Sequence, residues 1–153
     1  YRYRQSVQAN GVPIMQIVFC NSNMIGSWII RKLTFSKWSH VAILDGEDVI
    51  EAVWPRVRRT SFKHLVESHK DFEVVDITVG SDVSALAFAS SQIGKRYDWR
   101  ALFGLVTPTR DWERPEEWDC AELVAASINY GSTVPLFRDK ARVTPQMLYL
   151  LSK

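Results

Sequence analysis

The chain has 153 residues, of which 46% are apolar and 24% charged, a composition typical of one folded domain that excludes disordered, collagen-like and coiled-coil proteins. Its 19 basic and 17 acidic residues leave a net charge of +2, so we expect no nucleic-acid partner. The aromatic fraction of 12% exceeds what a core of this size needs, and we expect some rings to line a groove or a contact surface.

The sequence shows no targeting or membrane-spanning segment. Residues 1–14 lack the apolar core of a signal peptide, and no apolar run approaches the roughly 18–20 residues that cross a bilayer. We therefore expect an N-terminal arm or leader over residues 1–14, a single domain over residues 15–153 and no transmembrane segment. The location stays open between the cytoplasm and delivery to a cell wall by a particle.

Strand and helix signals follow one another along the chain. In the first half of the chain, the pattern predicts a strand over Met15–Cys20, a helix over Met24–Leu33, and a hairpin of His40–Leu44 and Val49–Trp54. It then predicts a helix over Phe62–Ser68 capped by Thr60 or Ser61, a strand over Phe72–Val79, and a helix through Ile93 capped by Ser81 or Asp82. In the last third, it predicts a short helix near Ala101–Leu105, a loop over Thr107–Trp118, a helix over Cys120–Tyr130, and a last helix from Thr144-Pro145 to the end. We assign no element to the short basic segment Val57–Thr60. Because the elements show no regular βαβ alternation, we expect an α+β fold with a small antiparallel sheet.

The segment Asp119-Cys120-Ala121-Glu122 predicts a helix start that carries a reactive thiol. Asp119 can cap the helix and Glu122 can complete a capping box, which puts Cys120 at the first helical position. A thiol there faces the positive end of the helix dipole and unpaired backbone N–H groups, which favour the thiolate and can stabilise an oxyanion. The alternative is a structural cysteine, since free Cys is often buried.

His40, at the start of the predicted hairpin, is the candidate base. A turn centred on Gly46 and Glu47 pairs Ala42 with Glu51, so that Glu51 lies on the same face as His40, roughly 7–8 Å away between α-carbons. A carboxylate there can fix the imidazole tautomer and favour the imidazolium. The opposite face carries an apolar set suited to a core: Val41, Ile43, Ile50 and Ala52. We expect the hairpin to bury this apolar side and to present the His/Glu pair on the other; the alternative is an ordinary solvated pair.

The other candidate residues indicate no second site. His64 and His69 lie among charged residues and are expected to be exposed on a helix, and Cys20 is expected in the core. The two cysteines form no CxxC motif, which argues against a zinc site and leaves a long-range disulfide open. The sequence contains neither a GxSxG elbow nor an HExxH motif, so we expect no serine nucleophile, no bound metal and no other cofactor.

Four segments in a fixed order resemble one protein family: Trp38–Ile43, Val49–Ala52, Ile93–Asp98 and Trp118–Val124. Together they resemble the permuted branch of the NlpC/P60 papain-like hydrolases, the YaeF/YiiX-type amidases, in which the histidine strand precedes the cysteine helix. The similarity covers the chain from about Met15 to Val124. It implies a circularly permuted papain-like α+β fold and a thiol hydrolase of amide bonds.

The resemblance also implies roles for individual residues. Cys120 takes the place of the nucleophile, His40 of the general base and acid, and Glu51 of the orienting residue. Tyr97 matches the family's Gly-x-x-Tyr-Asp segment and is implied in substrate binding or the oxyanion site; the alternative is that it packs a helix against the sheet. Asp119 stands where relatives often carry Ser, Thr or an aromatic residue, and its charge would raise the thiol pKa unless it is committed to the cap.

Five of the six tryptophans lie in the sequence beside the proposed site: Trp38, Trp54, Trp99, Trp112 and Trp118. Among them, we expect Trp38 and Trp118 to bind substrate as walls of a groove. The alternative is that the rings pack the hairpin against the helices.

Three functions are compatible with these residues. The first is a cysteine amidase or peptidase that forms a thioester acyl-enzyme on a peptide or peptidoglycan fragment. The second keeps the thiol chemistry in a lipid acyltransferase or thioesterase, with the apolar segment Ile25–Leu33 touching a membrane. The third is a non-catalytic structural component of a larger particle, such as a phage tail or a secretion apparatus.

Overall fold

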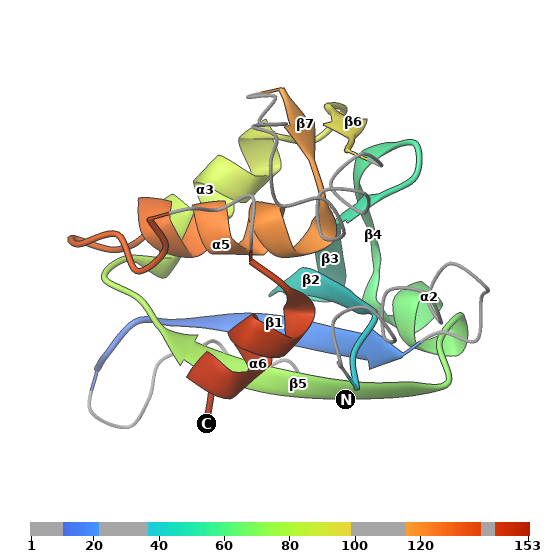
Figure 1. Ribbon diagram of the computed structural model, residues 1–153, viewed down its shortest axis with the longest axis horizontal. Coiled ribbons are helices and arrows are strands. Elements are labelled where there is room, and N and C mark those ends of the chain that lie inside the picture. The colour runs from blue at the N-terminus through green and yellow to red at the C-terminus, as the bar shows by residue number, and fades with distance from the viewer. Residues whose placement is uncertain (1–10, 22–36, 99–115, 139–142) are drawn as a thin grey trace, which may run out of the picture.

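A computed structural model describes residues 11–21, 37–98, 116–138 and 143–153 of the chain (Figure 1). Its strands are β1 (Ile14–Asn21), β2 (His40–Asp45), β3 (Asp48–Val53), β4 (Arg56–Ser61), β5 (Asp71–Thr78), β6 (Arg96–Tyr97) and β7 (Glu117–Trp118). The helices of these ranges are α2 (Phe62–Glu67), α3 (Asp82–Ser91), α5 (Cys120–Tyr130) and α6 (Pro145–Leu151). None of them is both long and apolar enough to cross a membrane.

The strands form one sheet in the order β5-β1-β2-β3-β4-β6-β7. Neighbouring strands run antiparallel except for the parallel pair of β6 and β7. The predicted α+β class is therefore confirmed, with a mixed sheet in place of the purely antiparallel one that was expected.

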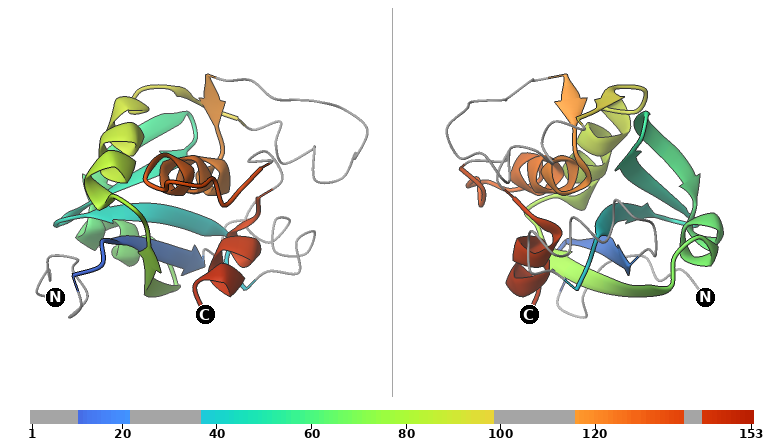
Figure 2. Two further views of the ribbon diagram at one scale, coloured as in Figure 1. Left: turned by 90° about the vertical axis from the view of Figure 1, so that its left-hand side faces the viewer. Right: turned by 45° about the vertical axis from the view of Figure 1, so that its right-hand side comes forward.

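The sheet curls around helices α3 and α5, which pack on its inner face (Figure 1, Figure 2). The main core lies between this face and α5, and its sheet residues include the apolar set predicted for the hairpin: Val41, Ile43, Ile50 and Ala52. A second, smaller cluster lies on the outer face beneath α2 and consists of Val18, Cys20, Ala42, Val49 and Leu65. The hairpin is thus covered on both faces, because α5 packs on one of them and the Leu65 side chain of α2 packs on the other.

The helices begin at the positions that the sequence predicts, each after a polar capping residue. In each of the four helices the residue before the first turn accepts a hydrogen bond from a backbone N–H three residues later: Ser61 in α2, Ser81 in α3, Asp119 in α5 and Thr144 in α6. Ser61, Ser81 and Asp119 are among the predicted caps, and Thr144 lies at the predicted start of the last helix; each satisfies an N–H that would otherwise lack a partner.

The helix α5 ends at Tyr130, as predicted, and Gly131 follows it close to the start of α3. A side-chain carbon at this position would lie 2.6 Å from the Ser81 carbonyl oxygen and 2.8 Å from Cβ of Ala85. The Gly131 carbonyl accepts a hydrogen bond of 2.7 Å from the Ser81 N–H. The absence of a side chain therefore lets the two helix ends approach.

The strand β4 occupies the basic segment to which the sequence assigns no element. It pairs with β3 along its whole length, from Val53↔Arg56 to Asp48↔Ser61. The predicted loop before Cys120 ends in the short strand β7. The predicted helices over residues 24–33 and 101–105, and most of that loop, lie outside the described residues.

Candidate active site

His40 and Glu51 meet at the open end of the β2–β3 hairpin. The ladder runs from Asp45↔Asp48 to Ile43↔Ile50, which is the predicted register, and both residues lie beyond its last pair. The Nε2 atom of His40 donates a hydrogen bond of 2.7 Å to Oε2 of Glu51. The structure therefore brings the predicted base and the predicted orienting carboxylate into contact.

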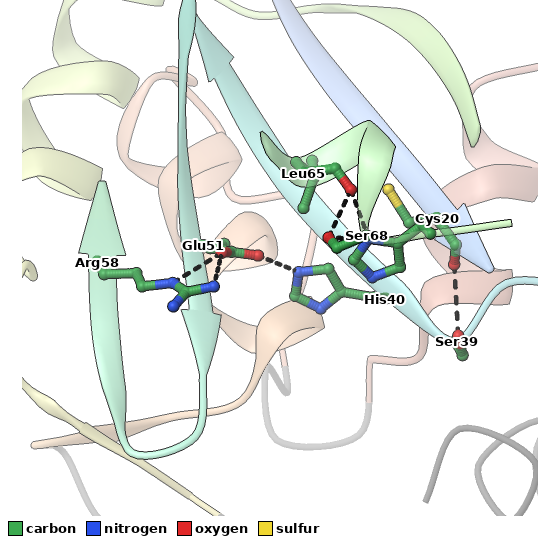
Figure 3. A network of polar contacts seen from close by, with 8 residues as sticks. Cys20, Ser39, His40, Glu51, Arg58, Leu65 and Ser68 are labelled. Atoms are coloured by element: carbon green, nitrogen blue, oxygen red, sulfur yellow. Dashed lines mark hydrogen bonds and ion pairs between the residues drawn. The ribbon is translucent and has the colours of Figure 1, made fainter. Parts of the chain in front are cut away.

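Arg58, on β4, is a second partner of Glu51 that the sequence analysis did not identify. Arg58 is directly opposite Glu51 in the register, and its Nε and Nη2 atoms lie 2.9 and 2.8 Å from Oε1 (Figure 3). The alternation Arg56-Val57-Arg58 is the signal that could have shown a strand, with Val57 turned into the core. Figure 3 shows Arg58, Glu51 and His40 following one another across β4, β3 and β2.

The buried Glu51 side chain, 2% exposed, carries a negative charge at neutral pH. Burial alone would raise the pKa of this carboxyl, but the hydrogen bonds from His40 and Arg58 prevail and lower it to about 2. Since the ionised carboxylate can only accept hydrogen bonds, it holds the proton of His40 on Nε2. The other ring nitrogen, Nδ1, is then left for a reacting partner.

Cys120 is a further neighbour of the His40 imidazole. It is the first residue of α5 and a buried free thiol. Burial of the imidazole alone would lower the pKa of His40, but the interactions with Cys120 and Glu51 prevail and raise it to about 10. Such an imidazole is a cation at neutral pH.

The side chain of Asp119 is committed to the helix cap, which is the condition that the sequence left open for this residue. Its Oδ1 atom accepts a hydrogen bond of 2.8 Å from the N–H of Glu122. Burial raises the pKa of Asp119 to about 6, against the backbone hydrogen bonds of Glu122 and Ala121, and the nearby charge of Asp98 adds to the rise. Protonation near pH 6 thus removes a negative charge next to Cys120.

Tyr97 lies on β6 and pairs with Trp118 of β7, two residues before Cys120. Burial raises the pKa of its phenol, and the negative charges of Cys120 and Asp119 add to this effect. The phenol is therefore a neutral hydrogen-bond donor near the thiol. The Tyr97 ring also packs against the main core, so the packing interpretation applies to it as well.

Trp38 and Trp118 do not line a groove, contrary to expectation. Their exposed fractions are 1% and 5%, and both belong to the main core. The Trp38 ring packs against Phe19, with centroids 6.1 Å apart, and the Trp118 ring packs edge-on against Phe88 at 5.9 Å. Both side chains point inward from the segments that lead into β2 and α5. Trp54 is exposed, and Trp99 and Trp112 lie outside the described residues.

The remaining histidines and cysteine differ in their environments. His64 is exposed on α2, as expected, whereas His69 is partly buried and its ring stacks on that of His40, contrary to expectation.

Cys20 is buried in the smaller cluster, and burial raises the pKa of its thiol to about 12, so it is an inert core residue. Both cysteines are free, and the disulfide left open by the sequence is not formed. Within the ranges given above, no group of three or more His, Cys, Asp and Glu side chains is arranged to hold a metal ion.

Comparison with known proteins gives a match in structure and none in sequence. No family model matches the chain, and no curated protein matches it. Among solved structures, the crystal structure of metalloprotein yiiX from Escherichia coli O157:H7 superposes with a TM-score of 0.64 and 20% sequence identity, covering 87% of this chain and 70% of that one. The chain therefore shares the fold of metalloprotein yiiX.

Proposed function

We propose that the chain is a cysteine hydrolase that cleaves an amide bond, with Cys120 as nucleophile, His40 as general base and acid, and Glu51 as the orienting residue. One observation carries the proposal: the His40 imidazole is bonded to a buried carboxylate at 2.7 Å through Nε2 and interacts with a thiol at a capped helix start. The fold shared with metalloprotein yiiX and the order of the four family-like segments support a permuted papain-like hydrolase.

The chemistry follows from the charges of the three groups. The Cys120 thiolate attacks the carbonyl carbon, and the tetrahedral oxyanion is stabilised by backbone N–H groups at the start of α5 and by the Tyr97 phenol. The His40 imidazolium gives its proton to the leaving amine as the C–N bond breaks, which leaves a thioester on Cys120. Neutral His40 then takes a proton from water, and the hydroxide formed attacks the thioester and releases the acid. Glu51 keeps the imidazole in the required tautomer throughout.

The substrate class is proposed from the family resemblance: a peptide or peptidoglycan fragment, reached in the cytoplasm or through association with a larger particle. A lipid ester or thioester is the competing substrate class, and the segment thought to touch a membrane, residues 25–33, lies outside the described residues. The two substrate classes therefore have to be compared directly in one assay.

The test is release of peptides from purified peptidoglycan by the wild type and by Cys120→Ala, His40→Ala and His64→Ala. We expect the first two variants to lose the activity and the exposed control, His64→Ala, to keep it. Iodoacetamide should label Cys120 and spare Cys20, whose thiol is buried and neutral. A wild type that neither turns over amides nor is labelled at Cys120 near pH 7 would overturn the enzyme proposal. Hydrolysis of a thioester or an acylated lipid with untouched peptidoglycan would overturn the substrate class.

A further inference from the structure

The ring of His69 stacks nearly parallel to the imidazole of His40. The two ring centroids are 5.7 Å apart and the ring planes differ by 8°. His69 follows α2, and its Nδ1 atom lies 2.7 Å from the carbonyl oxygen of Leu65 in that helix. Because a carbonyl oxygen only accepts hydrogen bonds, Nδ1 of His69 carries a proton and the ring is anchored to the end of α2.

The surroundings of His69 favour its neutral form. Burial lowers the pKa of the ring, the bond to Leu65 opposes this, and the positive charge of His40 lowers it further. The ionisable groups around the pair are Glu51 on β3, which acts on both rings, the Cys120 thiol on α5, which acts on His40, and the Cys20 thiol on β1, which is paired with His40 in the register. A neutral aromatic ring packs well against an imidazolium, whereas two protonated rings would repel one another.

We propose that His69 is a positioning residue for His40, a role that rests on the proposed function of His40. The imidazole of His40 is bonded through Nε2 to Glu51 and interacts with Cys120. The torsion about the bond between Cβ and the ring is broad for histidine, so the orientation of the imidazole depends on the groups that the ring contacts. The parallel His69 ring lies on one side of the imidazole and opposes movement of the imidazole out of its plane.

The experiment compares His69→Ala, His69→Phe and the matched control His64→Ala. For His69→Ala we expect kcat to fall by about 10- to 100-fold with KM within about twofold, because small misplacements of a reacting group have effects of this size. His69→Phe keeps a flat ring and should retain kcat within about threefold. Toward acid pH the wild type should lose rate as His69 becomes protonated, and His69→Phe, which lacks this protonation, should hold its rate to lower pH.

A second measurement does not depend on turnover. The pKa of His40, followed by NMR of its ring nitrogens, should move in His69→Ala from its raised value toward the ordinary 6.5, because both bonds that raise it become partly populated. It should stay in place in His69→Phe and His64→Ala. The proposal is overturned if His69→Ala keeps the kcat and the His40 titration of the wild type, or if His69→Phe is impaired as much as His69→Ala. Loss of all hydrolysis in the wild type would refute the proposed function, while the titration would still decide whether His69 positions the ring.

Discussion

Glu51 is a carboxylate with almost no exposure that contacts two cationic side chains, His40 and Arg58. A charge in such a place is tolerated only when its oxygens are matched by donors, and here Oε2 accepts from His40 while Oε1 accepts from Arg58. Arg58 is therefore more than a surface cation: it compensates the Glu51 charge on the side away from His40. The strand β4 therefore contributes a residue to the site, in addition to the three residues of the proposed chemistry.

Replacing Arg58 by Met should lower the free energy of unfolding by about 1.5–3 kcal/mol at pH 7, the range for hydrogen bonds to a charged group. Arg56→Met is the matched control, because Arg56 is also exposed on β4 but lies opposite Val53. Urea unfolding at several pH values makes the test sharper. The pKa of Glu51 is lowered from 4.5 to about 2, so its stabilising effect is present above pH 4.5 and is lost as the pH falls toward 2. The difference between Arg58→Met and the wild type should shrink over that interval; a constant difference would contradict the assigned contact.

At the scale of single elements, the start of α5 combines a cap with an ionisable group. Asp119→Ala should lower the free energy of unfolding by about 1 kcal/mol, because it removes the cap, whereas Asp119→Asn keeps an oxygen that can accept from the N–H of Glu122. The pKa of Asp119 is raised from 3.8 to about 6, so the native state binds the proton more tightly than the unfolded chain does. The wild type should therefore lose stability as the pH rises from about 4 to 6, and Asp119→Asn should lack this loss. Parallel pH profiles of the two proteins, from thermal or urea unfolding, would contradict the assignment.

The sequence predicts those elements whose signals are local. The four helix starts, the turn at Gly46-Glu47 and the register that follows from it depend on residues within a few positions of one another, and all are confirmed. The strand β4, the contact of Arg58 and the stacking of His69 depend on which strands become neighbours and on where α2 packs. A pattern within a single segment cannot carry that information, because the partners come from other segments of the chain.

At the scale of the whole molecule, the site is assembled from distant parts of the chain that one curled sheet brings together. His40 and Glu51 come from the central strands β2 and β3, Cys120 from a helix on the inner face, and His69 from the segment after α2, against the outer face. Trp38, just before β2, packs against Tyr149 of the C-terminal helix α6, with ring centroids 5.6 Å apart. The C-terminal helix thus belongs to the structure that supports the site, a role that its sequence does not indicate.

If α6 is part of one cooperative unit with the site, its buried face should determine global stability. Leu148 is fully buried and Leu150, in the same helix, is 65% exposed. Leu148→Ala should lower the free energy of unfolding by about 2–5 kcal/mol, the range for truncating a buried leucine, and Leu150→Ala by less than about 0.5 kcal/mol. Urea unfolding should be followed by far-UV circular dichroism and by the alkylation rate of Cys120, and the two midpoints should shift together in Leu148→Ala. Equal effects of the two variants, or a midpoint for Cys120 that stays at the wild-type value, would show instead that α6 unfolds independently of the site.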